Sequence, residues 1–206
     1  MNNYIIKSVS SLEKCFLDDN IQDKKEYTSF SCLLNEKLNF QIAYIMTSDT
    51  LKDKSPCYFH IQSELKDFIR VYKVESVAVR LPVYHNLPIN NYQRKVPHCY
   101  PDLLCPYDKK DNVYFVPNLL QSLFIEVDLS DNTCFYGDYV IKCYFTDNDG
   151  NTVASTNVSV NIINSMLSEK KITFTQWFHG DCLASYYAVK PLSKKHFTIM
   201  KNFLKT

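Results

Sequence analysis

Apolar and polar residues alternate with a period of two through the middle of the chain. In the stretch SLFIEVDLS, the aliphatic side chains from Leu123 to Leu129 fall on one face, while those of Glu126 and Asp128 fall on the other. Successive side chains of a β-strand point to opposite faces of its sheet. The pattern therefore predicts a strand with one buried face and one exposed face.

Further strands are predicted on both sides of this one. GDYVIKCYF from Gly137 is rich in aromatic and β-branched residues, and TNVSVNI from Thr156 alternates again, with an Asp-Gly hairpin signal at 149–150 between them. These three strands are expected in meander order. Upstream, SFSCLLNEKLNFQIAYIM predicts two strands joined near 35–37, and IRVYKVESVAVRLPVY predicts a pair broken around Glu75. The spacing favours an antiparallel β-sandwich.

Two stretches fit the alternation less well. SSLEKCFLDD places Leu12, Cys15 and Phe16 at helical spacing behind serines that could cap a helix, so a helix is the alternative there. Residues 87–118 hold five of the eight prolines and few periodic segments. We expect a long ordered loop over this range.

The C-terminal part changes in character. ITFTQWF predicts a buried strand, and PLSKKHFTIMKNFLKT predicts a helix that Ser193 caps, with an apolar stripe along one face. The stripe consists of Phe197, Met200, Phe203 and Leu204. A strand, a loop and an amphipathic helix make one βα unit, which needs neighbours to cover it. We therefore predict a sandwich domain over 1–168 and the start of a second domain over 169–206.

Composition and charge narrow the classes of function. The 206 residues are 46% hydrophobic and 14% aromatic, as expected for a globular chain, and the 23 basic and 22 acidic side chains nearly cancel. A nucleic acid or an anionic membrane is therefore not an expected partner. The N-terminus lacks the apolar core of a signal peptide, and no apolar run is long enough to span a membrane, so a cytoplasmic location is expected.

The eight cysteines contain no C-x-x-C pair, and we expect free, mostly buried thiols. His98 lies near Cys99 and Cys105, but the spacing matches no standard metal site. We therefore expect neither a metal nor a cofactor. The sequence also lacks a glycine-rich phosphate loop and a nucleophile elbow.

Four stretches, in order along the chain, resemble glycoside hydrolase family 123, the N-acetyl-β-galactosaminidase family. They are LNFQIAY at 38–44, HCYPDLLCPY at 98–107, GDYVIKCYF at 137–145 and FTQWFHGDCLASYYAVKPLSKKHF from Phe174. The last resembles the first strand and helix of the catalytic (β/α)8 barrel in that family. The resemblance implies a mainly β fold, in which an antiparallel β-sandwich precedes one βα unit of an incomplete barrel.

The resemblance also implies a reaction, namely hydrolysis of a terminal β-linked N-acetylgalactosamine in which the acetamido group of the substrate attacks the anomeric carbon. The family performs it with an adjacent Asp-Glu pair. This chain contains no Asp-Glu dipeptide, so we expect the chain alone to be inactive. Active sites of such barrels lie at the ends of the strands. Trp177, His179 and Asp181 are therefore the candidate sugar-binding residues in a complete barrel. The alternatives are that Trp177 belongs to the core, where a lone Trp in a barrel strand is more often found, and that His179 and Asp181 only order a loop.

The leading hypothesis is an N-terminal supporting domain of a glycoside hydrolase acting on a glycan that contains N-acetylgalactosamine. Two alternatives remain open. One is a stand-alone carbohydrate-binding sandwich that uses exposed tyrosines for stacking. The other is a protein-interaction module, which could self-associate through the uncovered βα unit. The Tyr100-Pro101-Asp102 segment could shape a sugar site or brace the sandwich against the next domain.

Overall fold

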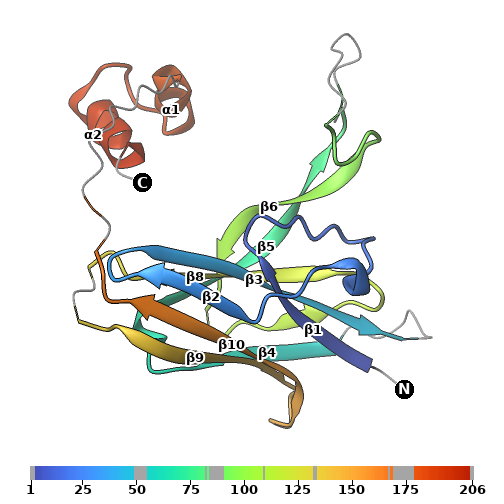
Figure 1. Cartoon of the computed structure of the whole chain (residues 1–206). Coiled ribbons are helices and arrows are strands. Elements are labelled where there is room, and N and C mark those ends of the chain that lie inside the picture. The colour runs from blue at the N-terminus through green and yellow to red at the C-terminus, as the bar shows by residue number, and fades with distance from the viewer. Residues whose placement is uncertain are drawn as a thin grey trace. The chain divides into compact units, whose positions relative to one another are not determined.

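The computed structural model describes residues 3–48, 55–81, 83, 91–108, 110–131, 134–166, 168 and 179–204, without the side chain of Ser55. The chain divides into two compact units, Met1–Leu167 and Ser168–Thr206. In its described residues, the first unit is a stack of two sheets (Figure 1). The prediction of a mainly β fold with a sandwich-like arrangement is confirmed.

Sheet A has the strand order β1-β3-β8-β5-β6, and all its neighbouring strands are antiparallel. Its strands are β1 (Asn3–Ser10), β3 (Lys37–Thr47), β8 (Gln121–Asp128), β5 (Ile69–Val79) and β6 (His98–Pro106). Only the first part of β5 pairs with β8, whereas the rest pairs with β6 alone. The far ends of β5 and β6 therefore extend beyond the other strands as a two-stranded arm (Figure 1).

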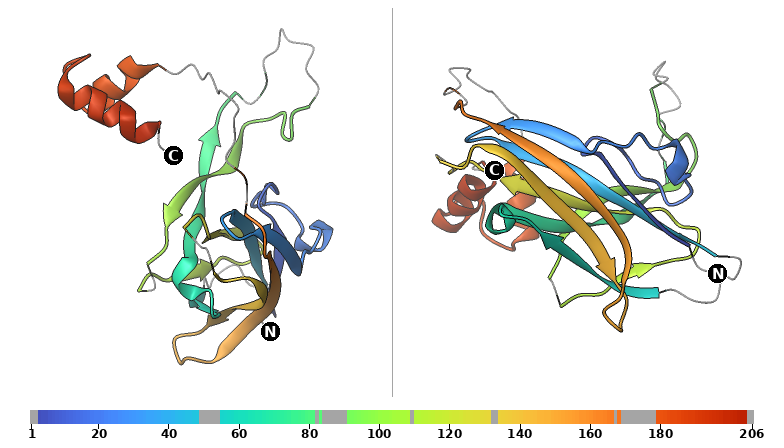
Figure 2. Two further views of the ribbon diagram at one scale, coloured as in Figure 1. Left: turned by 60° about the vertical axis from the view of Figure 1, so that its left-hand side comes forward. Right: turned by 60° about the horizontal axis from the view of Figure 1, so that its bottom comes forward.

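Sheet B has the strand order β2-β10-β9-β4-β7, and the β2–β10 pair is parallel while the other pairs are antiparallel. Its strands are β2 (Ser29–Leu33), β10 (Thr152–Ile163), β9 (Gly137–Thr146), β4 (Ser55–Gln62) and β7 (Val113–Phe115). The main core lies between the sheets and includes Phe40, Phe115 and Phe145. The two sheets can be followed as layers in Figure 2.

Strand β3 is buried on both faces. Phe40, Ile42 and other even-numbered positions face the main core, whereas Ala43 and Ile45 belong to a second cluster with Cys15 and other residues of the preceding segment. Residues 11–24 thus cover the outer side of sheet A. This explains why the apolar run in β3 is nearly continuous, because alternation requires that one face meet water.

Strands β8, β9 and β10 form where the alternation predicts them, and Leu123, Ile125 and Val127 are fully buried. The meander is wrong, however, because β8 lies in sheet A whereas β9 and β10 lie in sheet B. Local alternation specifies which face of a strand is buried but not which strand it pairs with. The predicted break at Glu75 is a shift in the β5–β6 register within one continuous strand.

Two other expectations are wrong. The range 87–118 is not a long loop, because it contains β6 and β7. Strand β6 tolerates Pro101 and Pro106 because it is an edge strand, where a missing N–H breaks no ladder on the open side. The helix alternative at SSLEKCFLDD is also wrong: the segment forms turns, followed by the 3-10 helix η1 (Ile21–Asp23). A second 3-10 helix, η2 (Lys66–Phe68), connects β4 and β5.

The second unit contains α1 (Gly180–Tyr186) and α2 (Lys194–Phe203). The predicted cap is confirmed, because the Oγ of Ser193 accepts a hydrogen bond of 3.3 Å from the backbone N–H of His196. Helix α1 lies where a loop was expected, so that expectation is wrong. The predicted strand ITFTQWF lies outside the described residues.

Candidate functional site

The structure describes two of the three candidate sugar-binding residues, while Trp177 lies outside the described residues. His179 immediately precedes α1, and Asp181 lies in the first turn of this helix. Both side chains are exposed. The structure therefore places a hydrogen-bonding ring and a carboxylate at the start of one short helix.

His196 joins the two helices of this unit. Its ring is only 1% exposed; Nδ1 accepts a hydrogen bond of 2.9 Å from the N–H of Leu192, and Nε2 donates one of 2.8 Å to the carbonyl of Gly180. These partners require the proton on Nε2. His196 thus holds the residue between His179 and Asp181. His196 was not among the candidate residues predicted from the sequence, although His196 and Met200 share one helix face at i and i+4.

Gly180 packs against α2. A Cβ atom at this position would lie 3.4 Å from the Cε of Met200 and 3.8 Å from the His196 ring, which is ordinary van der Waals contact. An alanine here would therefore fit without moving the start of α1.

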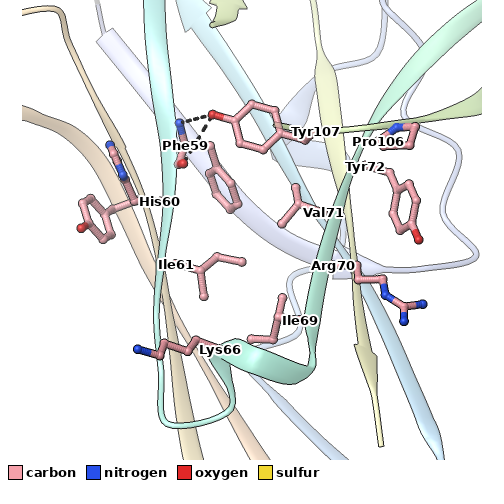
Figure 3. Close-up of a pocket in the computed structure, with 11 residues that line it drawn as sticks. Phe59, His60, Ile61, Lys66, Ile69, Arg70, Val71, Tyr72, Pro106 and Tyr107 are labelled. Carbon is pink, nitrogen blue, oxygen red and sulfur yellow. Dashed lines mark hydrogen bonds between the residues drawn. The ribbon is translucent and has the colours of Figure 1, made fainter. Parts of the chain in front are cut away.

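The sandwich contains a separate cavity of about 470 Å³ between β4 and β5 (Figure 3). In Figure 3 the side chains of Ile61, Ile69 and Val71 point into the space between these strands, and the ring of Tyr107 lies above them. These four residues pack against the main core. The edge of the main core is therefore partly exposed at this cavity.

Tyr107 connects the two strands that border this opening. Its backbone N–H donates to the carbonyl of Val71 on β5 at 2.9 Å. Its hydroxyl accepts from the N–H of Phe59 on β4 at 3.1 Å and lies 3.5 Å from the Phe59 carbonyl. Burial raises the pKa of Tyr107, so the hydroxyl keeps its proton and acts as a structural bridge.

The Tyr100-Pro101-Asp102 segment lies in β6 and contacts the segment that covers sheet A. The Tyr100 ring packs edge-on against Phe16 at 5.2 Å between centroids, and Lys14 donates to Asp102 at 2.9 Å. Both contacts lie within the first unit. They attach the base of the β5–β6 arm to the covering segment.

Charged groups strengthen the same attachment. The Arg94 guanidinium lies 4.1 Å from the centroid of the Phe16 ring and forms ion pairs with Asp18 and Asp19, and Lys24 lies 2.7 Å from Asp19. Burial opposes ionisation of Asp19, but hydrogen bonds from Lys24, from the Phe16 N–H and from Arg94 outweigh it and lower the pKa of Asp19. This carboxylate therefore stabilises the folded covering segment only while it is ionised.

The thiols and imidazoles of the described residues do not form a metal site: no three His, Cys, Asp or Glu side chains cluster there. His98 directs Nδ1 to the Cys99 carbonyl and Nε2 to Asp18. All eight cysteines are described, and none of them forms a disulfide. Burial raises the pKa of Cys143 to about 12 and that of Cys57 to about 11, so these thiols are weak nucleophiles near neutral pH. Among the described helices, none is long and apolar enough to cross a bilayer.

The comparisons with known proteins agree with the resemblance seen in the sequence. Residues 177–206 match the model of the glycoside hydrolase 123 catalytic domain. The chain also resembles the structure of a family 123 glycoside hydrolase from Clostridium perfringens, described in connection with glycolipid glycan hydrolysis. That match has a TM-score of 0.69 at 15% identity, over 98% of this chain and 36% of the other. The resemblance to glycoside hydrolase family 123 is confirmed.

The chain thus spans about a third of the length of its family 123 structural relative, and at 15% identity the TM-score of 0.69 shows a common fold alone. Two other structures match with TM-scores too low to carry an argument. One is the N-terminal domain of PorA, with a TM-score of 0.33 at 9% identity over 80% of this chain and 100% of the other. The other is AggA, the major subunit of aggregative adherence fimbriae type I from Escherichia coli, with a TM-score of 0.37 at 6% identity over 79% of this chain and 96% of the other. No protein with a curated description matches the chain. Together, the comparisons support a glycoside hydrolase-like protein.

Proposed function

We propose that this chain is the supporting sandwich, together with the first βα unit of the catalytic barrel, of a family 123-like hydrolase. The observation that carries this proposal is the match of residues 177–206 to the family 123 catalytic domain, directly after a two-sheet unit. The substrate would be a glycan that ends in β-linked N-acetylgalactosamine. The sandwich would stabilise the barrel without taking part in the chemistry.

The proposed reaction needs two carboxyl groups, one to orient the acetamido group of the sugar and one to protonate the leaving oxygen. The 206 residues contain no Asp-Glu dipeptide to supply them as neighbours. His179 and Asp181 would instead bind the sugar, with the imidazole donating to one hydroxyl and the carboxylate accepting from another. Trp177 would form the apolar surface on which the sugar ring lies.

A chromogenic N-acetyl-β-galactosaminide tests the proposal. We expect the 206-residue chain to release no chromophore above the uncatalysed background, and turnover by this chain would contradict the supporting role. We expect a reading frame that continues past Thr206 to encode an Asp-Glu pair and further βα units. In that longer protein, His179→Ala should lower kcat/KM at least tenfold, whereas the exposed Thr198→Ala should not. Equal activity of both variants would remove His179 from the site.

A second function, self-association, is suggested by the exposed apolar residues of α2. Phe197 and Phe203 are each 53% exposed and Leu204 is 62% exposed. We propose that a second copy of the chain covers this face when no other βα unit does. Sedimentation should show a dimer that Phe197→Glu dissociates and the exposed Lys194→Glu does not. A monomer at all accessible concentrations would contradict this proposal.

A further inference from the structure

Sheet B exposes a polar outer face, on which three strands form a row of hydrogen-bonding side chains. Gln62 on β4 pairs with Lys142 on β9, and Lys142 pairs with Asn157 on β10. Residues paired across adjacent strands point to the same side of the sheet, about 4.8 Å apart. All three side chains are exposed. The row therefore presents an amide, an ammonium group and a second amide. The three strands that carry these side chains lie side by side in Figure 2.

This row lines a hollow of about 760 Å³, where the β4–β5 connection turns away from the sheet. Within the described part of the chain, the amides of Gln62 and Asn157 have no hydrogen-bond partner, and Lys142 contacts only the Tyr144 ring, at 5.4 Å from its centroid. The hollow thus presents two planar amides, each with donors and an acceptor, that the protein does not use.

The other groups around the hollow limit the kind of ligand it can take. Lys66 and Lys142 are balanced by Glu64 and Asp138, so the hollow attracts neither anions nor cations strongly. Val140, which is 55% exposed, supplies one apolar patch beside the row. A peptide would need deeper apolar pockets or an open strand edge, whereas β9 is paired on both sides here.

We infer that this hollow binds carbohydrate. Amides and ammonium groups hydrogen-bond to sugar hydroxyls, and an aliphatic patch contacts the C–H groups of a sugar ring. The next row along the strands holds His60 and Tyr144, whose rings stack at 5.0 Å between centroids. A glycan longer than one sugar would reach this pair. The binding is independent of the hydrolase proposal, because the sandwich alone carries it.

The cavity between β4 and β5 has a different chemistry. Ile61, Ile69, Val71 and the Tyr107 ring form its apolar wall, and Lys66, Arg70, His60 and Tyr144 also line it. The Tyr107 hydroxyl already bonds to the Phe59 backbone. Among the residues described, no side-chain amide lines this cavity, so it lacks the pair of amides found in the hollow. The hollow on the outer face of sheet B is therefore the carbohydrate site that we assign.

NMR titration of the isotope-labelled chain with N-acetylgalactosamine, and then with a trisaccharide of β-linked N-acetylhexosamines, tests the assignment. We expect saturating shifts at Gln62, Lys142 and Asn157, with a dissociation constant on the order of millimolar for the monosaccharide. The trisaccharide should bind more tightly and should also shift His60. Glycerol at equal concentration should leave the spectrum unchanged.

The double variant Gln62→Ala/Asn157→Ala should weaken binding at least tenfold, while Ser31→Ala on the same face should bind as the original chain does. His179→Ala separates this site from the proposed barrel site and should also leave binding unchanged. Shifts confined to α1 or to the apolar wall of the β4–β5 cavity at Ile61, Ile69 and Val71, an unchanged dissociation constant in the double variant, or no saturable shifts at all would each overturn the assignment. Equal melting temperatures show that the variants are folded.

Discussion

Gln41 fastens the covering segment 11–24 to the outer side of sheet A. This side chain is 4% exposed, and its Nε2 lies 2.7 Å from the Glu13 carbonyl, 3.1 Å from the Ser10 carbonyl and 3.3 Å from the Ser11 carbonyl. Its Oε1 accepts a hydrogen bond of 2.9 Å from the hydroxyl of Ser122, which is also buried. The two N–H groups of a single amide thus serve three backbone carbonyls, and its oxygen serves one hydroxyl, away from water.

Replacing Gln41 with Met keeps the size of the side chain and removes its two N–H donors and its one acceptor, which is equivalent to three hydrogen bonds. A buried hydrogen bond contributes about 1 kcal/mol net, so we expect Gln41→Met to lower the free energy of unfolding by about 3 kcal/mol. Ser122→Ala removes only one of the three and should cost about 1 kcal/mol. The double variant should cost little more than Gln41→Met, because the two single changes remove the same bond.

Urea unfolding followed by circular dichroism of the sheets measures these differences. The matched control is Gln62→Met on β4, an exposed glutamine without a hydrogen-bond partner among the described residues, which should change the free energy of unfolding by less than about 0.5 kcal/mol. If the covering segment detaches before the sheets unfold, hydrogen exchange at Leu120 will report it, because this N–H donates to the Leu17 carbonyl. A loss below about 1 kcal/mol for Gln41→Met, with Leu120 still protected, would refute the reasoning.

Three further predictions concern thiols, acid and the helical unit. Iodoacetamide near neutral pH should alkylate the exposed Cys134 and Cys182 first and Cys143 only after unfolding, as mass spectrometry can show. Because the pKa of Asp19 is lowered, its contribution to stability is present above the ordinary carboxyl pKa of about 3.9 and is lost as the pH falls through the lower folded-state pKa. In Asp19→Asn, the free energy of unfolding measured in urea should therefore fall less steeply over this acid range. Ser193→Ala should destabilise α2 by about 1 kcal/mol through loss of its cap, detectable as faster amide exchange in that helix alone.

The features predicted correctly from the sequence are those that depend on residues close together along the chain. The alternation around Leu123 and Ile125, the Asp-Gly turn at 149–150 and the cap at Ser193 appear in the structure as expected, because each is a local signal. The strand partners of β8 and the existence of β6 were missed. Proline content argued against a strand at 98–106, but the pairing of β6 with β5 at an open edge overrides that local preference.

The candidate sites were predicted to different extents. His179 and Asp181 came from the resemblance and are placed at the start of α1. His196 was missed, because a histidine beside two lysines in an amphipathic helix is expected to be exposed. The hollow on sheet B could not be found either: Gln62 and Asn157 are brought together only by the pairing of β4, β9 and β10. Such clusters depend on register, which single-sequence patterns do not fix.

The parallel pairing of β2 with β10 has a consequence for how the first unit forms. Ser29 pairs with Ser159, so sheet B joins an early part of the chain to one that is synthesised much later. During translation β2 has no partner until β10 has emerged from the ribosome, and closing so large a loop costs entropy before any contact repays it. The sandwich should therefore assemble late and slowly. A nascent chain that stops before β10 should be the species most dependent on chaperones.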